Sequence, residues 1–194
     1  MAEDGKETLA SMGDDTPSAV LSERYRPLSH YFRQNFSQVT NPPIDSLREF
    51  RVMSLKTRFG NLRNVLDEGT NQSEILALES PFVGNSQWVE LIKNFKSDVV
   101  NLDCTFDKGE NLEQAIKRIQ KESEISVRQG VTQLILSDKN ISEQRLAIPM
   151  LLSVGAINTH LIKNKLRGYA SINAQTAEAL DTHSFATLIG VGAT

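Results

Sequence analysis

Hydrophobic and polar positions follow two different patterns along this chain, and the change comes near residue 80. Before it, short patches of helical spacing are separated by turn-forming residues. After it, runs of β-branched and apolar residues alternate with runs in which apolar residues recur every three or four positions. The second pattern is typical of strands that alternate with amphipathic helices. We therefore expect a loop-rich and helical N-terminal part, residues 1–80, and a βα-repeat part, residues 81–194.

Two helices are predicted in the N-terminal part. Apolar residues at helical spacing predict the first over residues 28–36. Pro42 and Pro43 must end it, because proline has no backbone N–H to donate to a helix. Pro43 suits the first turn of a second helix that continues through Phe50. The first sixteen residues are polar and are expected to form an extended or loop segment.

Three strands and three helices are predicted in the βα-repeat part. In chain order they cover residues 99–106, 111–129, 132–136, 148–165, 169–173 and 176–189, starting with a strand. Such short alternation predicts an α/β fold with a parallel sheet and crossover helices. The residues up to Thr194 complete a third helix, so a fourth strand is expected next and the chain is expected to be a fragment.

Composition and charge narrow the classes of function. Lys plus Arg number 21 and Asp plus Glu number 24, so the chain lacks the basic excess expected of a nucleic-acid binder. No run of about eighteen apolar residues predicts a membrane span, and the start has no signal-peptide pattern. The single cysteine, Cys104, cannot form an internal disulfide or hold an iron–sulfur cluster. A reducing, cytoplasmic location is expected.

Polar residues at the strand ends are the candidate site. Parallel βα units bring the carboxyl ends of their strands to one side, where ligands bind. The residues expected there are Asp103, Thr105, Asp107, Ser137, Asp138, Asn173 and Gln175. They could hold a polar ligand, or they could simply end the strands and cap the following helices.

Other residues that often carry chemistry have a structural interpretation here. Cys104 lies inside an apolar run and is expected to be a small buried hydrophobe. His30, His160 and His183 are far apart in the sequence and are expected to pack rather than bind metal. The run from Gly190 to Gly192 follows a helix instead of a strand, so it does not fit a phosphate-binding loop.

Several long strings resemble the central region of the large subunit in the glutamate synthase family. They occur in the order in which that family has them. The strings cover residues 11–17, 19–22, 31–45, 78–81, 102–106, 136–138, 148–156, 183–186 and 188–193.

The resemblance implies a fold and a function. It implies a central domain that is barrel-like but incomplete, similar to part of a TIM barrel. This domain would join a glutaminase domain and an FMN synthase domain of the same chain and help to line an ammonia tunnel. The full enzyme would convert glutamine and 2-oxoglutarate to two glutamates with FMN, an iron–sulfur cluster, and electrons from a small subunit or ferredoxin.

This segment would itself carry no catalytic, cofactor-binding or metal-binding residue, and alone it would be inactive. Thr16, Thr105 and Ser137 are the predicted tunnel-lining residues, with Asp103 and Asp138 as further strand-end candidates. The loop around Thr16 is equally well interpreted as a solvated linker. One alternative is a stand-alone α/β enzyme in which Asp103 and Asp138 form the catalytic pair. Another is an interaction module that uses the N-terminal loops.

Overall fold

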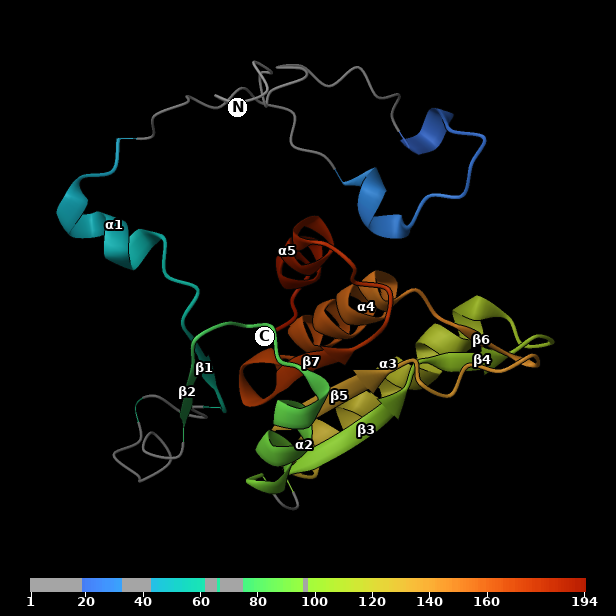
Figure 1. The fold of residues 1–194 in the computed structure, drawn as a ribbon. Helices are drawn as coiled ribbons and strands as arrows, with labels where there is room; N and C mark the ends of the chain where they lie inside the picture. Colours follow the sequence, from blue (N-terminus) through green and yellow to red (C-terminus); the bar gives the residue numbers. More distant parts are fainter. Residues whose placement is uncertain (1–18, 33–42, 62–65, 67–74, 96–97) are drawn as a thin grey trace, which may run out of the picture.

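The computed structural model describes residues 19–32, 43–61, 66, 75–95 and 98–194. In Figure 1 helices α3 and α4 lie beside the parallel sheet, and helix α1 stands apart from them. The other ranges, including Thr16 and residues 33–36 of the first predicted helix, lie outside the described residues. Among the described helices, none is long and apolar enough to cross a membrane.

The parallel sheet contains three strands that neighbour one another in sequence order. These strands are β3 (Val99–Asp103), β5 (Gln133–Ser137) and β7 (Ser171–Gln175), with β5 in the middle. Their register places Asp103 beside Ser137 and Ser137 beside Gln175. The last residues of all three strands therefore form one row, as the candidate site requires.

Helices α3 (Leu112–Arg128) and α4 (Met150–Lys163) provide the two crossovers and pack against each other. Asn111 begins α3 by accepting a hydrogen bond from the Glu113 N–H, as expected for an N-cap. Helix α5 (Thr182–Gly190) follows β7 and is capped by Asp181. It begins later than the predicted residue 176, because the residues before Asp181 form a loop.

The two faces of the sheet differ in chemistry. Side chains alternate along a strand, so Leu134 and Leu136 face the helices and join Ile172 in the main hydrophobic core. On the other face lie Gln133 and Asn173, which are also buried. The amide of Asn173 donates to the Gln133 side chain at 3.0 Å. A buried polar face therefore lies opposite the apolar one.

A short antiparallel pair of strands beside the sheet was not predicted. Strand β4 (Thr105–Asp107) pairs antiparallel with β6 (Arg145–Ala147). The prediction of one continuous strand over residues 99–106 was therefore wrong, since the chain leaves the sheet at Cys104.

The N-terminal part contributes short elements. They are the 3₁₀ turns η1 (Ala19–Leu21) and η2 (Leu28–Tyr31), helix α1 (Ser46–Val52), and strands β1 (Thr57–Phe59) and β2 (Leu76–Leu78). Helix α2 (Asn85–Lys93), which was not predicted, lies at the start of the βα-repeat part. A further 3₁₀ turn, η4 (Arg167–Tyr169), precedes β7. Of the predicted helix over 28–36, the described residues form one 3₁₀ turn, which ends where Phe32 has extended backbone angles. The second predicted helix begins after Asp45, whose carboxylate caps it.

The α/β fold class and the parallel βα units are confirmed. The described residues form an open three-stranded sheet and do not close into a barrel. The strands lie in the order of the chain because each of the two helical crossovers joins a strand to its immediate parallel neighbour.

Candidate functional site

Asp103, the last residue of β3, is the centre of a polar network. Its Oδ1 accepts the Thr105 backbone N–H at 3.0 Å and the Thr105 hydroxyl at 2.6 Å. Its Oδ2 accepts from Asn140 at 3.1 Å and from Arg145 at 3.0 Å. The carboxylate is thus hydrogen-bonded on both oxygens, and it holds the turn between β3 and β4.

Arg145 brings β6 into the same network. Its guanidinium donates to the buried Thr105 hydroxyl at 2.8 Å and to Asp107 at 3.3 Å. Partial burial favours the neutral acid of Asp103, but the hydrogen bonds from Thr105 and Asn140 and the Arg145 charge outweigh it. Together they hold the pKa of Asp103 below its usual value. Asp103 is therefore an ionised structural carboxylate at neutral pH and a poor general acid.

Ser137 and Asp138 follow β5 and are both buried. The Ser137 carbonyl accepts the Cys104 N–H at 2.9 Å, while its hydroxyl makes one long contact, 3.4 Å from the Lys139 nitrogen. The Thr176 hydroxyl donates to Asp138. Asp103 and Asp138 thus have separate partners, and no contact described between them forms the catalytic pair of the alternative hypothesis.

One of the two interpretations of these strand-end residues, that they cap the following helices, does not hold. Helix α3 is capped by Asn111, and α4 begins at Met150 after Pro149, whose side chain makes no capping hydrogen bond. Instead, Glu178 reaches back and accepts the Met150 N–H at 2.9 Å. Burial and the nearby Asp138 charge raise the pKa of Glu178, while the hydrogen bond from Met150 lowers it, and burial dominates.

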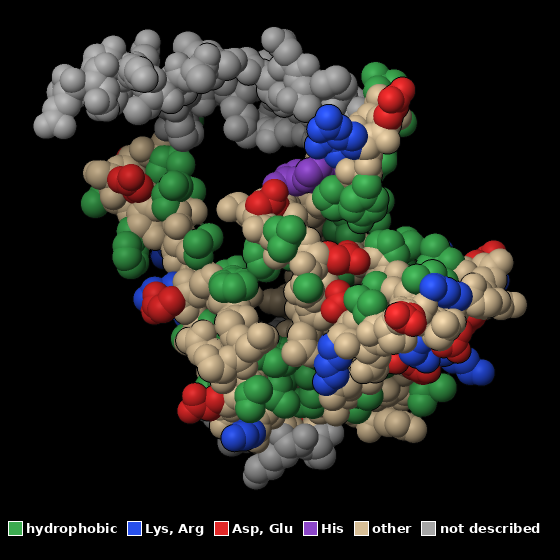
Figure 2. Space-filling model, turned by 45° about the vertical axis from the view of Figure 1, so that its right-hand side comes forward, with side chains coloured by type: hydrophobic (Ala, Val, Ile, Leu, Met, Phe, Trp, Pro, Cys, Tyr) green, Lys and Arg blue, Asp and Glu red, His purple; other side chains and the backbone are tan. Residues whose placement is uncertain are grey.

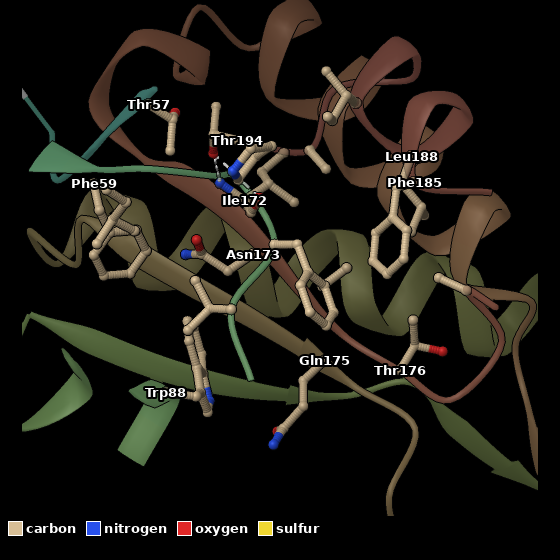
Figure 3. Close-up of a pocket in the computed structure, with 18 of the residues that line it drawn as sticks. Thr57, Phe59, Trp88, Ile172, Asn173, Gln175, Thr176, Phe185, Leu188 and Thr194 are labelled. Carbon is tan, nitrogen blue, oxygen red and sulfur yellow. Dashed lines mark hydrogen bonds between the residues drawn. The ribbon is translucent and has the colours of Figure 1, made fainter. Parts of the chain in front are cut away.

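A groove of about 420 Å³ lies along the outer edge of β7, as Figure 3 shows. Phe59 and Trp88 line one side, and Phe185 and Leu188 of α5 line the other. Phe59 packs edge-on against Trp88, with ring centres 6.0 Å apart. The groove is therefore mainly apolar, with the backbone of an edge strand as its floor.

The polar groups of the groove come from β7 and the loop after it. Asn173, Gln175 and Thr176 line it, together with Thr57 of β1 and Thr194. Among the described residues that line it there is no lysine or arginine. Its described lining therefore offers a phosphate group, such as that of FMN, no cationic side chain.

The remaining candidate residues have structural partners. Cys104 is fully buried, and burial raises the pKa of its thiol to about 11. The ring of His160 contacts Glu124 at 2.8 Å, and that of His183 contacts the Ser29 carbonyl at 2.9 Å. Within the described part of the chain, no three His, Cys, Asp or Glu side chains gather as metal ligands would. Since iron–sulfur clusters are held by several cysteines, a chain with one does not fit such a cluster.

The structure brings some of the predicted site residues together. Asp103 and Thr105 contact each other, and Ser137 lies beside Asp103 in the sheet. Asp138 is directed to Thr176 instead, and Thr16 lies outside the described residues. Sequence reasoning missed Arg145 and the aromatic residues of the groove, because their partners are distant along the chain.

Charged side chains on the face in Figure 2 show no separation by sign. Lysine and arginine are interspersed with aspartate and glutamate over this face. Along α3, oppositely charged side chains form pairs, such as Lys117 with Glu113 at 2.7 Å. This face therefore offers no continuous basic patch to a polyanion.

Comparison with known proteins gives one consistent family. Residues 1–194 match the family model described as the glutamate synthase central domain. The glutamate synthase (NADPH) large chain of Azospirillum brasilense is 55% identical over 197 residues, which cover 100% of this chain and 13% of that protein. The chloroplastic ferredoxin-dependent glutamate synthase of Oryza sativa subsp. japonica is 46% identical over 199 residues, 100% of this chain and 12% of that protein.

A more distant relative has a third electron donor in its name. The glutamate synthase (NADH) of Schizosaccharomyces pombe is 37% identical over 201 residues, 100% of this chain and 10% of that protein. This chain spans only about an eighth of the length of the Azospirillum brasilense and Oryza sativa relatives.

Proposed function

Because this chain belongs to the glutamate synthase family and matches its central domain over residues 1–194, we propose that it connects the catalytic domains of a glutamate synthase large chain. The observation that carries the proposal is this match over the whole chain, combined with relatives that are many times longer. The contacts of the strand-end carboxylate Asp103 support the proposal. They are made to Thr105 and Arg145 of the same domain, which is typical of a structural residue.

In this proposal the chemistry takes place in neighbouring domains of the same polypeptide. A glutaminase domain releases ammonia from glutamine, and a synthase domain uses it to aminate 2-oxoglutarate reductively, which yields two glutamates. FMN and an iron–sulfur cluster supply electron transfer in those other domains. A small electron-transfer subunit or ferredoxin delivers the electrons; the relatives are named for NADPH, ferredoxin and NADH.

We also propose that part of this domain lines the ammonia passage. Neutral ammonia can be guided by hydroxyl and carbonyl groups without being held as an ion would be. Among the predicted residues, Ser137 has the hydroxyl with the most remaining hydrogen-bonding capacity, since its one contact is long. The Thr105 hydroxyl is already engaged by Asp103 and Arg145. Thr16 stays a candidate tunnel-lining residue, and only the resemblance of the sequence to the glutamate synthase family supports it.

A substitution at Ser137 tests this role in an intact large chain. We expect Ser137→Val to lower the glutamate formed per glutamine hydrolysed, because ammonia would escape to water. Synthesis from added ammonium should be unchanged, since the synthase site is elsewhere. Ser142→Val, at an exposed serine, is the matched control. An unchanged ratio in Ser137→Val would contradict the tunnel role of this residue.

Three further expectations stay predictions. The 194-residue chain alone should neither hydrolyse glutamine nor bind flavin, and glutaminase activity above a buffer control would contradict this. A division near residue 80 should separate the loop-rich part from the βα-repeat part. The proposed location is the cytoplasm, although the names of several relatives place them in chloroplasts.

The sequential order of β3, β5 and β7 also supports the barrel-like interpretation of the domain. In a TIM barrel each strand pairs with the next strand of the chain. We propose that the three strands are a segment of such an incomplete barrel, in which the polar face with Gln133 and Asn173 is the inner one.

A further inference from the structure

The outer edge of β7 has the properties of a strand that is paired on both sides. Ser171, Ile172 and Asn173 are all buried, although β7 is last in the sheet. Its five residues include no charge and no proline, the devices that usually protect an exposed edge. Sheets made only of parallel strands are normally buried within a domain.

Thr194 already makes the first contacts of such a pairing. Its backbone N–H donates to the Ile172 carbonyl at 2.8 Å, and its hydroxyl accepts the Ile172 N–H at 2.7 Å. Figure 3 shows Thr194 beside Ile172 at one end of the groove. After β7 and the crossover helix α5, the chain has thus returned to the N-terminal half of β7, where a parallel neighbour would start.

The next backbone groups along this edge are those of Ala174. The Ser171 N–H points to β5, where it donates to the Thr132 carbonyl at 2.8 Å, while the groups of Ile172 point outward. Backbone groups alternate in direction along a strand, so those of Asn173 face β5 and those of Ala174 face the groove. On this outer side, the described residues give the Ala174 N–H and carbonyl no partner.

We propose that a further extended segment of the large chain binds in the groove and pairs in parallel with β7. The proposal rests on the proposed function, since the segment comes from the longer polypeptide. Its backbone bonds to Ala174, and its apolar side chains fill the space between Trp88 and Phe185. Strand addition suits this site because backbone hydrogen bonds give affinity and the flanking aromatic walls accept alternate side chains.

Amide hydrogen exchange in the intact large chain tests the proposal. Three amides serve in one experiment: Ala174, Asn173, which faces β5, and Gly109, which lies in an exposed turn. We expect Ala174 to exchange within about tenfold of Asn173 and at least about 100-fold more slowly than Gly109. Exchange of Ala174 at the rate of Gly109 would overturn the proposal.

A second arm separates a strand from a small ligand. The exchange is repeated with glutamine and with 2-oxoglutarate added. Protection of Ala174 that is already complete without them supports the strand, and protection that appears only with a metabolite would overturn it in favour of a ligand pocket. The exchange result does not depend on the glutamate formed per glutamine hydrolysed by Ser137→Val. The proposed tunnel role of Ser137 and the proposed strand beside β7 can therefore be disproved separately.

Discussion

The Arg145 guanidinium lies 3.0 Å from Asp103 Oδ2 and joins the end of β3 to β6, 42 residues later in the chain. The same guanidinium donates to the Thr105 hydroxyl, which itself donates to Asp103. Asp103 and Thr105, which the sequence pattern assigns to a candidate ligand site, therefore bind each other and Arg145. This network positions the row of strand ends and leaves the groove beside β7 as the open surface.

Removing one partner of this pair should destabilise the domain. We expect Asp103→Asn and Arg145→Met each to lower the free energy of unfolding by about 1 kcal/mol. This is the modest range for a pair in which about a third of each side chain is exposed. Chemical denaturation measures both, and the double variant should cost less than their sum. Strict additivity would contradict direct coupling; Lys117→Met, in an exposed pair, is the control with little effect.

The effect of Asp103→Asn should depend on pH. The pKa of Asp103 is lowered in the folded state, so its ionised form contributes stability above the unfolded-state pKa of about 3.9. This contribution is lost as the pH falls through the lower folded-state pKa. Denaturation curves at neutral pH and near pH 3 should therefore show a smaller difference between wild type and variant in acid. A difference that stays constant would show that ionisation is unimportant here.

Two glycines near the end of α5 should respond differently to alanine. Gly192 has a φ of 121°, and an added Cβ would lie 2.3 Å from Asn158 Cγ. We expect Gly192→Ala to destabilise the chain by about 1–3 kcal/mol. Gly190 is helical with nothing within 4 Å of a built Cβ, so Gly190→Ala should be neutral or slightly stabilising. Equal melting temperatures of the two variants would be inconsistent with this packing.

Cys104 should react only when the chain opens. Its thiol is fully buried and has a pKa of about 11, so about one part in a thousand is thiolate at pH 8. Mass spectrometry after a maleimide pulse should show almost no adduct on the folded chain and one adduct in denaturant, since this is the single cysteine. Rapid labelling under native conditions would contradict the burial of Cys104.

The sequence predicts the regular elements better than the contacts between them. Helix α3 was predicted within one residue at each end, because its apolar spacing and the Asn111 cap are local signals. Strand β6 has three residues, too few for a period to be recognised. Arg145 was missed as a site residue because its partners depend on the pairing of β4 with β6.

The groove depends on contacts that no local pattern contains. Its walls combine Phe59, Trp88 and Phe185, which belong to three separate elements. Asn173 was expected at a strand end as a polar ligand, yet it lies in the middle of β7 and binds Gln133. The strand began two residues later than predicted, because η4 occupies the residues before it.

The size of the native polypeptide decides whether this chain is one domain of a glutamate synthase large chain. An antibody raised against this segment would be used to blot an extract of the source cells. We predict a single band several times larger than 21.6 kDa, the mass of the 194 residues alone. A band at 21.6 kDa would contradict it and would make the chain a free-standing protein whose function must lie in its own groove and strand ends.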